Sequence, residues 1–421
     1  MAPLGPFEPS PNLAVAVSGG ADSMCLAWLA HGWAGARRGT VRGFVVDHGL
    51  RPDSAAEAAL TAARLAAMGV PPTVLTLAGL SHGPALAERA RVARHAALEA
   101  ACAAAGLLHL LLGHHAADQA ETVAMRLLRA GTPAGLAGMA ALSETARLRR
   151  LRPLLAIPPG RLRATLAAAG VAWVEDPSNA NPRAERNRIR LLRGDRDGIG
   201  PATSAAVEAA RLRAGQRAAA EAADAAWLAT AAELYPEGFA VLDPRGLRPG
   251  ALATLLRMLA GRAYAPPAAQ VAAWAAAPRP ATLGGVRIMA GPPDLLRAGH
   301  LQAGRLLLAR EAASMAPARP ATEGATWDGR FRVVASPPGL TIGALGAEAA
   351  RLRRLSALPA AVLRTLPALR RDERLVAVPH LRYAATMEKE GVRIVFDPPS
   401  PAAGAAFFAA PGMQTRVAHP M

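Results

Sequence analysis

A short glycine-rich loop near the start of the chain has the residue types that bind phosphate. Its members are small or polar: Ser18, Gly19, Gly20, Ala21, Asp22 and Ser23. An apolar run at 13–17 precedes the loop and a helical segment at 22–30 follows it, which is the setting that a phosphate-binding loop requires. Glycines let the backbone approach an anion, hydroxyls add donors, and a helix start carries partial positive charge. No Gly-Lys-Ser follows, so this is not a Walker loop, and an ordinary glycine-rich turn is the alternative.

Two further groups of polar residues follow apolar runs. Asp47 and His48 come after the run at 43–46. Gly113, His114 and His115 come after the run at 107–112. The two histidines could belong to a metal site, but no third ligand has matching spacing. This favours contacts with a substrate or with phosphate.

The elements around these residues must bring them to one place. Apolar runs alternate with helical segments, which predicts an α/β fold with a doubly wound parallel sheet, covered by helices on both faces. Such a sheet binds ligands at the carboxyl ends of its strands, where the loop and both polar groups lie. Ser54 and Glu57 form a capping box at one helix start, and Pro84 opens another helix. The expected strands span 13–17, 43–46, 73–77 and 107–112, and the expected helices span 22–30, 54–68, 84–106 and 116–129.

Two carboxylates and two arginines have helical spacing near this edge. Asp118 and Glu121 lie three residues apart on one helix face. They could be ordinary acids of a first helical turn, but at this edge they also suit a cationic amino acid or Mg²⁺. Arg186 and Arg190 also share a face, and we expect them to contact phosphate rather than to form a solvated stripe.

The charge of the chain indicates a polyanionic partner. Among 421 residues, 48 basic residues stand against 31 acidic ones, a net charge of +17, and Lys389 is the only lysine. Cationic surfaces bind nucleic acid because counterions are released, so we expect a nucleic-acid partner. Codon bias would explain arginine in place of lysine but not the excess over acids. Arg150 and Arg152 in the run 147–152, and the arginines of 351–354, fit either contact with RNA or a solvated face.

Composition excludes several classes of protein. An apolar content of 52% argues against disorder. Cys25 and Cys102 cannot form a disulfide framework, a four-cysteine zinc site or an iron–sulfur cluster, and we expect both in the core. The N-terminus lacks the features of a signal peptide, and no run of about 18 apolar residues exists, so we expect a cytoplasmic protein without a membrane segment. No obligate protein partner is evident, and the sequence leaves a homodimer open.

The chain divides into three expected domains. Residues 1–197 hold the α/β sheet. A charged run at 193–197 and a linker at 198–201 lead into a mainly helical middle domain, 198–316, which begins with an alanine-rich helix at 203–234. A second linker at 317–324 opens a small α+β C-terminal domain, 317–421, with a flexible tail.

The loop resembles the PP-loop of the N-type ATP pyrophosphatases, whose signature is SGGxDS. That resemblance implies reaction at the α-phosphate of ATP, with pyrophosphate as the leaving group. Further segments resemble the tRNA(Ile)-lysidine synthases: 47–51 (DHGLR), 90–98 (ARVARHAAL), 113–122 (GHHAADQAET), 176–179 (DPSN) and 186–190 (RNRIR). They cover most of 13–193 in the family's order, and the likeness is loose beyond about residue 210. Two positions depart from the pattern, because His95 replaces the usual Tyr and Ala117 replaces a frequent acid.

The resemblance implies roles for these residues. It implies ATP and Mg²⁺ as cofactors, free L-lysine and tRNA(Ile) with a CAU anticodon as partners, and ligation of lysine to C2 of the wobble cytidine through an adenylated cytidine. The expected catalytic residues are Asp22, His114, Asp118 and Glu121, with Asp22 also at the metal. The expected ATP-binding residues are Ser18, Gly19, Gly20, Ala21, Asp22, Ser23, Asp47, His48, Arg91 and Gly113. The expected tRNA-binding residues are Arg150, Arg152, Arg186 and Arg190.

Two alternatives to lysidine formation stay open. A PP-loop tRNA thiolase also adenylates a base, but such enzymes generally need paired cysteines, and the sequence has no CxxC. The other alternative is a catalytically silent tRNA-binding protein on the same fold. The intact SGGADS loop argues against it.

Overall fold

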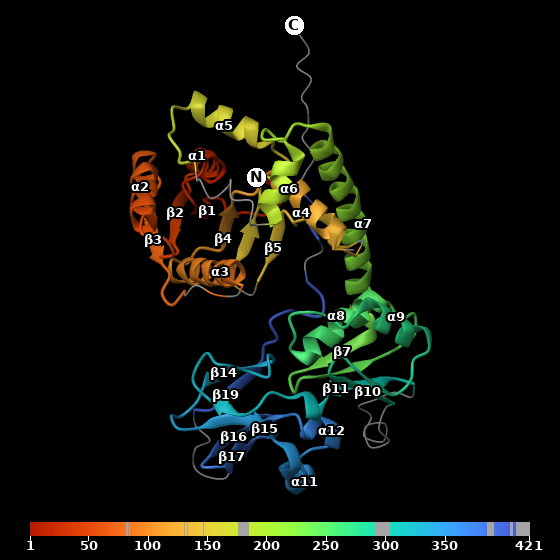
Figure 1. Ribbon diagram of the computed structural model, residues 1–421. Coiled ribbons are helices and arrows are strands. Elements are labelled where there is room, and N and C mark those ends of the chain that lie inside the picture. Colours follow the sequence, from red (N-terminus) through yellow and green to blue (C-terminus); the bar gives the residue numbers. More distant parts are fainter. Residues whose placement is uncertain are drawn as a thin grey trace. The chain divides into compact units, whose positions relative to one another are not determined.

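The computed structural model describes residues 1–80, 83, 85–129, 131–132, 134–145, 147–175, 185–290, 304–384, 391–404 and 407–409. The chain forms two compact units (Figure 1): unit 1 contains Met1–Ala219 and Ala405–Met421, and unit 2 contains Ala220–Gly404. The domain boundaries expected at 197/198 and 316/317 fall inside these units, and the three-domain division stays a prediction. Among the described residues, no helix is long and apolar enough to cross a membrane.

Unit 1 is built on a six-stranded sheet in the order β3-β2-β1-β4-β6-β5. Five of its strands run parallel, and β5 is antiparallel at one edge. The four strands expected from apolar runs are confirmed to within a few residues. The strands are β1 Asn12–Val17, β2 Thr40–Asp47, β3 Pro72–Thr76, β4 His109–Leu112, β5 Leu142–Glu144 and β6 Arg149–Leu151.

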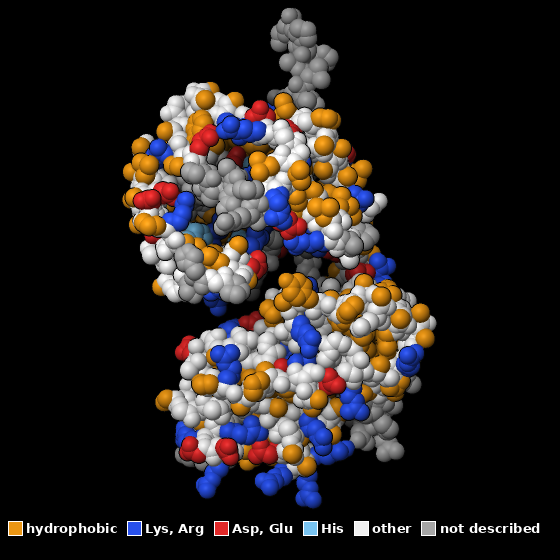
Figure 2. Space-filling view, viewed as in Figure 1, with side chains coloured by type: hydrophobic (Ala, Val, Ile, Leu, Met, Phe, Trp, Pro, Cys, Tyr) orange, Lys and Arg blue, Asp and Glu red, His pale blue; other side chains and the backbone are white. Residues whose placement is uncertain are grey.

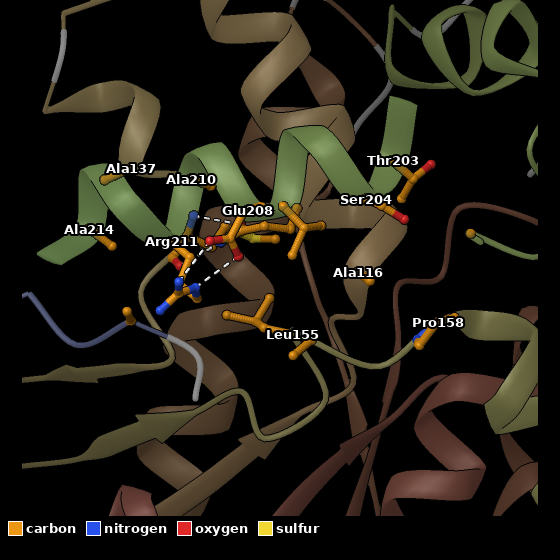
Figure 3. Close-up of a pocket in the computed structure, with 16 residues that line it drawn as sticks. Ala116, Ala137, Leu155, Pro158, Thr203, Ser204, Glu208, Ala210, Arg211 and Ala214 are labelled. Atoms are coloured by element: carbon orange, nitrogen blue, oxygen red, sulfur yellow. Dashed lines mark hydrogen bonds and ion pairs between the residues drawn. The ribbon is translucent and has the colours of Figure 1, made fainter. Parts of the chain in front are cut away.

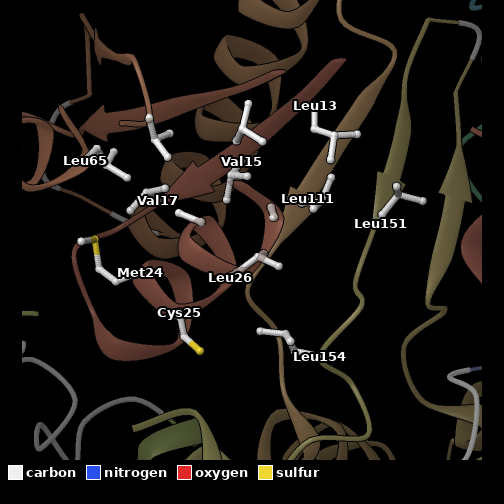
Figure 4. Packing of buried hydrophobic residues seen from close by; sticks show 14 of the residues in the cluster. Leu13, Val15, Val17, Met24, Cys25, Leu26, Leu65, Leu111, Leu151 and Leu154 are labelled. Atoms are coloured by element: carbon white, nitrogen blue, oxygen red, sulfur yellow. The ribbon is translucent and has the colours of Figure 1, made fainter. Parts of the chain in front are cut away.

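Helices cover both faces of this sheet, which confirms the doubly wound arrangement. Side chains of β1 that point to one face pack with helices α1 (Ala21–Gly35), α2 (Ser54–Ala67) and α5 (Pro159–Ala168), as Figure 4 shows for the residues around Val15. Those that point to the other face pack with α3 (Leu86–Ala104). Cys25 lies in the first of these cores and Cys102 in the second, and both thiols are free. The other α-helices described in this region are α4 Ala116–Leu128, α6 Glu185–Arg193 and the first part of the long α7 Pro201–Ala231, whose residues from Ala220 belong to unit 2.

The start of α2 differs from the expected capping box. Asp53 is the N-cap residue and makes no side-chain capping hydrogen bond. The Ser54 hydroxyl instead donates to the Asp47 carboxylate, and Glu57 accepts from Arg51 at 2.7 Å. Both side chains of the expected box are therefore used by other partners. The expected helix start at Pro84 lies outside the described residues.

Unit 2 combines short helices with antiparallel sheets. A five-stranded sheet, β7-β8-β11-β10-β9, was not specified by the sequence analysis, and α8 and α9 pack against it. A second five-stranded sheet has the order β12-β15-β16-β17-β18, and a third has the order β13-β14-β19. The first sheet of unit 2 and its helices consist of β7 Ala232–Tyr235, β8 Phe239–Leu242, α8 Pro249–Ala260, α9 Ala268–Ala276, β9 Ala281–Leu283, β10 Val286–Ala290 and β11 Leu306–Arg310. The other two sheets and their helices consist of β12 Arg319–Pro320, β13 Thr326–Trp327, β14 Phe331–Ala335, β15 Thr341–Ala344, α11 Ala349–Leu352, α12 Ala360–Leu363, β16 Pro367–Arg371, β17 Arg374–Val378, β18 Tyr383–Ala384 and β19 Arg393–Phe396.

Basic side chains are spread over both units, with several projecting from the end of unit 2 that carries α11 (Figure 2). Arg351 lies on this helix, and Arg353 and Arg354 follow it directly. All three are exposed. The arginines of 351–354 therefore lie on the surface, on a helix of one turn and on the residues directly after it.

Candidate active site

The predicted phosphate loop connects β1 to α1 and is held by its own hydroxyls. The Ser18 backbone N–H donates to Ser23 Oγ at 3.1 Å, and Ser23 Oγ donates to the Gly20 carbonyl at 3.0 Å. Gly19 has a φ of +85°, and a Cβ there would lie 2.5 Å from Thr61 Oγ1. A Cβ on Gly113 would lie 3.1 Å from Ser23 Cα, so this strand end approaches the loop backbone closely. Both glycines are therefore required for the close packing of the loop.

A cavity of about 1010 Å³ opens at the carboxyl ends of β1, β2 and β4, as the sheet topology predicts. Its volume lies at the upper end of the range for small-molecule sites, ~300–1,000 Å³, which gives room for a nucleotide and a second small group. Gly19, Ala21, Glu121, Arg150 and Arg152 are not among its lining residues. The predicted site residues that line it are Ser18, Gly20, Asp22, Ser23, Asp47, His48, Arg91, Gly113, His114, Asp118, Arg186 and Arg190.

His115 joins the two predicted catalytic aspartates, a role that the sequence analysis did not assign to it. It is the N-cap of α4, where its Nδ1 accepts from the Asp118 backbone N–H at 3.4 Å and its own N–H donates to Asp118 Oδ2 at 3.0 Å. Its Nε2 lies 3.4 Å from Asp22 Oδ2 and 3.6 Å from Asp118 Oδ2. The helix start therefore holds Asp22, His115 and Asp118 in one group.

Burial and nearby charges shift the pKa values of His114, His115 and Asp118 in different directions. Burial lowers the pKa of His115, but the hydrogen bond to Asp22 and the nearby carboxylates outweigh burial and raise it above its usual value. Burial raises the pKa of Asp118, but His115, His114 and Arg186 outweigh this effect and lower it. Burial, reinforced by nearby arginines, lowers the pKa of His114 to about 3. His114 is thus neutral near pH 7, whereas Asp118 is ionised.

Glu121 lies behind this group and is held by two arginines of α6. Its side chain is fully buried, with Oε1 2.7 Å from Arg190 Nε and Oε2 3.3 Å from Arg186 Nε. Arg190 Nη2 also lies 3.7 Å from Asp118 Oδ1. The predicted pair of arginines therefore faces carboxylates. About a third of each arginine side chain is still exposed, which leaves room for a further contact at the cavity.

Arg147 is exposed, but Arg149, Arg150 and Arg152 have different roles from those expected for a solvated face. Arg150 pairs with Glu99 at 2.8 Å. Arg152 donates to the Ala140 carbonyl at 2.9 Å, and burial with nearby arginines lowers its pKa to about 10. Arg149 donates to the Pro6 carbonyl at 2.7 Å and so holds the N-terminal segment. These side chains have partners within the protein, and whether Arg150 or Arg152 also contacts tRNA stays a prediction.

Asp47 and Asp22 provide carboxylates near the loop in two different states. The Gly49 N–H and the Ser54 hydroxyl donate to Asp47 and lower its pKa. Asp22 Oδ1, in contrast, is a buried oxygen without a hydrogen-bond partner among the described residues. A carboxylate oxygen beside a phosphate loop suits Mg²⁺, which proteins usually bind through one or two carboxylates and substrate phosphates. The described residues contain no cluster of three or more metal-ligating side chains, so the phosphates would have to supply further ligands.

Other predicted features do not reach the site or cannot be placed. Cys25 and Cys102 are buried, and burial raises the pKa of their thiols to about 11 and about 12. Neither thiol is placed to deliver sulfur to a ligand in the cavity. The DPSN segment at 176–179 lies outside the described residues.

Comparisons with known proteins identify relatives of this chain. Residues 3–193 match the PP-loop domain family. The tRNA(Ile)-lysidine synthase of Bradyrhizobium sp. strain BTAi1 is 44% identical over 191 residues, which are 45% of this chain and 53% of that relative. The tRNA(Ile)-lysidine synthase of Ruegeria pomeroyi is 34% identical over 393 residues, which are 88% of this chain and 89% of that relative. The chain thus spans about half the length of the first relative and most of the second.

One solved structure shows a weaker likeness. The U34-tRNA thiolase NcsA from Methanococcus maripaludis matches 50% of this chain and 76% of that chain, at 19% identity and a TM-score of 0.40.

Proposed function

Because the chain belongs to the tRNA(Ile)-lysidine synthase family, we propose that it joins free L-lysine to C2 of the wobble cytidine in the CAU anticodon of tRNA(Ile). ATP adenylates the C2 oxygen, pyrophosphate leaves, and the lysine ε-amine then displaces AMP. One observation carries this proposal. The loop at 18–23 and the acidic group of Asp22, His115 and Asp118 line the same cavity. One site can therefore hold both a triphosphate and a cation.

We assign ATP to the loop and to the cavity wall around it. Ser18, Gly20 and Ser23 line the cavity at the start of α1, where the helix dipole and free N–H groups favour phosphate. Arg91 and His48 line it from neighbouring elements. Burial, with Arg94 nearby, lowers the pKa of His48, so its ring is neutral near pH 7 and can donate to a phosphate or ribose oxygen.

We place Mg²⁺ at Asp22, whose Oδ1 has no hydrogen-bond partner within the described part of the chain. When bound, the ion would neutralise charge on the phosphates and favour departure of pyrophosphate. The protein's contribution is to hold Asp22 in place, because His115 Nε2 lies 3.4 Å from its other carboxylate oxygen.

We assign the lysine ammonium to Asp118. An amine with a pKa of ~10.4 is almost wholly protonated at pH 7, so it arrives as a cation and must lose a proton before it attacks. The lowered pKa of Asp118 keeps it ionised, which suits binding of the cation better than removal of its proton. His115, 3.6 Å away and with a raised pKa, is the stronger base of this pair. Glu121 then acts through Arg186 and Arg190 as a positioning residue.

We expect tRNA to be recognised by residues beyond the cavity, because a single cytidine cannot distinguish one tRNA from another. The net charge of +17 and the exposed arginines near α11 support a polyanionic partner. Contacts of Arg150, Arg152, Arg186 and Arg190 with tRNA, a homodimer and a cytoplasmic location stay predictions.

The test is incorporation of labelled lysine into a tRNA(Ile) transcript. Protein, ATP, Mg²⁺ and lysine should add one lysine residue to the wobble nucleoside of the CAU transcript, as seen by mass spectrometry after digestion. A transcript with a GAU anticodon and a reaction without ATP are the matched controls. ATP-dependent pyrophosphate release with CAU transcript but no lysine adduct would contradict lysidine formation. No nucleotide turnover with any transcript would favour the silent binding protein.

A further inference from the structure

The end of the chain returns to unit 1 after unit 2 is complete. Unit 2 ends at Gly404, and the described residues 407–409 belong to unit 1. We propose that residues 407–409, here called the C-terminal strap, dock on the edge strand β5 and fix the turn that joins residues 140–142 to Arg152. The strap is thus a positioning element for this turn, supplied by a segment more than 250 residues away in sequence.

Backbone pairing anchors the strap to the edge of the sheet. Phe408 forms an antiparallel bridge with Leu142 of β5, and the Ala141 N–H donates to the Phe408 carbonyl at 2.8 Å. β5 is the last strand of the six-stranded sheet, so its outer edge would otherwise present unpaired backbone groups. The strap covers this edge at Leu142.

Side chains add to this anchorage on both sides. Phe408 packs against the main apolar core of unit 1. The Phe407 ring lies under the Arg217 guanidinium of α7, with 4.4 Å from Cζ to the ring centroid, within the range of a cation–π contact. Ala409 lines a cavity of about 210 Å³ between α7, α4 and the segment 155–158 (Figure 3). The strap therefore contacts β5, α7 and the core together.

Two consecutive hydrogen bonds connect the strap to Arg152. The Ala141 N–H donates to Phe408, and the Ala141 carbonyl accepts from the Arg152 N–H at 2.7 Å. The Arg152 guanidinium then donates to the Ala140 carbonyl at 2.9 Å. Release of the strap would free the 140–142 segment and, with it, the position of the Arg152 charge.

Arg152 in turn acts on His114, which lines the cavity and whose pKa is lowered chiefly by burial and further by nearby arginines. The charged side chains that act on His114 come from four elements: Asp118 of α4, Arg152 beyond β6, Arg186 of α6 and Arg94 of α3. Arg152 is one of the cations that lower the pKa of His114. A displaced Arg152 would therefore let that pKa rise towards its ordinary value.

Two truncations test the strap directly. One protein stops after Gly404 and lacks the strap, and the matched control stops after Ala409 and keeps it. We expect the Ala141 and Arg152 amides to exchange hydrogen on the order of tenfold faster in the shorter protein, since each loses a hydrogen bond or its support. The control should exchange like the full chain. Equal exchange in the two truncated proteins would overturn the proposal.

A second measurement separates positioning from simple loss of stability. In the shorter protein, the His114 ring should titrate at higher pH than in the control, as followed by NMR. A synthetic peptide of residues 404–412, added in trans, should restore both the slow exchange and the low titration. If the shorter protein fails to fold, two variants of the full chain, Phe408→Ala and Phe407→Ala, take its place. Both the faster amide exchange and the higher His114 titration should then be larger in Phe408→Ala than in Phe407→Ala. An unchanged His114 titration with a released strap would contradict the positioning role.

Neither readout requires lysidine formation, although the use of the cavity that His114 lines rests on the proposed function. A failure of the proposed function would appear as absent lysine incorporation with normal strap behaviour. A failure of the strap proposal would appear as unchanged exchange in an active protein.

Discussion

Each unit of the protein holds arginines around a buried carboxylate, yet the two clusters differ in what surrounds them. In unit 2, Asp328 lies 3.0 Å from Arg310 Nε and 2.8 Å from Arg330 Nη2, and all three side chains are at most 5% exposed. In unit 1, Glu121 is equally buried, but its partners Arg186 and Arg190 are 34% and 35% exposed. The first cluster is sealed by protein and the second opens on a cavity.

The polar atoms around each cluster show what this difference means. Asp328 also accepts from the Ala316 N–H at 2.9 Å, and Arg330 donates to the Gly238 carbonyl at 3.2 Å, so this cluster joins segments of the fold to one another. Arg330 Nη2 of this cluster has no hydrogen-bond partner among the described residues but lies 2.8 Å from Asp328 Oδ2, whereas Asp22 Oδ1 and His114 Nδ1 around the unit 1 cluster are buried without a hydrogen-bond partner among those residues. Buried polar atoms are rarely left unpaired without a reason. We infer that the unit 2 cluster is structural and that the unit 1 cluster completes its contacts with ligands.

Breaking the sealed cluster should have the largest effect on stability. Asp328→Ala leaves the guanidiniums of Arg310 and Arg330 buried without their anion, which typically costs about 3–5 kcal/mol. Chemical denaturation of the full chain should show this loss in the transition of unit 2. Nucleotide binding by unit 1 should be preserved under native conditions.

The matched control for this change is an exposed ion pair in the same unit. Arg332 and Asp397 form such a pair, with side chains 34% and 41% exposed. Asp397→Ala should lower the free energy of unfolding by less than about 1 kcal/mol, because solvent replaces the lost charge. Equal losses for Asp328→Ala and Asp397→Ala would mean that burial does not distinguish the two sites.

Removing one charge from the open cluster should reduce activity instead of stability. Asp118→Asn keeps an oxygen that can accept from the His115 N–H, so the start of α4 is preserved. Without the carboxylate charge, lysine binding and turnover should fall on the order of 10²-fold, as for other groups that stabilise charge in an active site. Lysine-dependent AMP release measures the loss. If the folded Asp118→Asn protein releases AMP with lysine as fast as the unchanged protein, the assignment of lysine to Asp118 is wrong.

Local signals explain why part of this site could be predicted from the sequence. The loop at 18–23 and the first four strands depend on adjacent residues and apolar runs, and the structure confirms the strands closely. Asp118 was predicted for the same reason, because it follows a strand end in a helix's first turn. His115 was not predicted as a catalytic residue, because histidine is not a usual N-cap residue and its place three residues before Asp118 gave no clear local signal.

Features that depend on distant partners could not be predicted. The run 147–152 is rich in arginine and suggests a solvated face, yet Leu151 is fully buried and Arg149 holds the N-terminal segment. Only the position of β6 between β4 and β5 makes this clear. Ser54 has the spacing of a capping box, but Asp47, from another strand, takes its hydroxyl. Tertiary partners overrode a correct local signal in both places.

Glu121→Gln would sharpen the comparison, because this residue is as buried as Asp328 but lies beside the cavity. Its arginine partners can turn towards solvent, so the free energy of unfolding should fall by about 1–3 kcal/mol, less than for Asp328→Ala. Activity should fall as well, since Arg186 and Arg190 lose their anchor. Denaturation of Glu121→Gln and Asp328→Ala under the same conditions gives the comparison. A larger loss for Glu121→Gln would show that exposure of the arginines does not reduce the cost.

Buried histidines make the stability of each unit depend on pH, and these effects should be smaller than those of the substitutions above. Burial lowers the pKa of His114 in unit 1 to about 3 and that of His380 in unit 2 to about 4. Each ring binds its proton more readily in the unfolded chain, at a pKa of ~6.5, so each contributes a loss of stability as the pH falls below ~6.5. The loss is at most roughly 1.4 kcal/mol per pH unit for each histidine.

His115 adds a second pH dependence to the free energy of unfolding of unit 1, a loss towards alkaline pH, which no described histidine of unit 2 adds. Its pKa is raised in the folded state, so the stability that it contributes is present below ~6.5 and is lost as the pH rises through the folded value. Unit 1 should therefore lose stability on both sides of ~6.5, whereas the His380 contribution in unit 2 falls only towards acid. Denaturation between pH 5 and pH 8 measures both effects. His380→Gln should reduce the loss of unfolding free energy towards acid pH in unit 2 alone. His115→Gln should remove the loss of unfolding free energy towards alkaline pH in unit 1. If His115→Gln still loses stability towards alkaline pH, the carboxylates around Asp22 do not raise the pKa of His115 as expected.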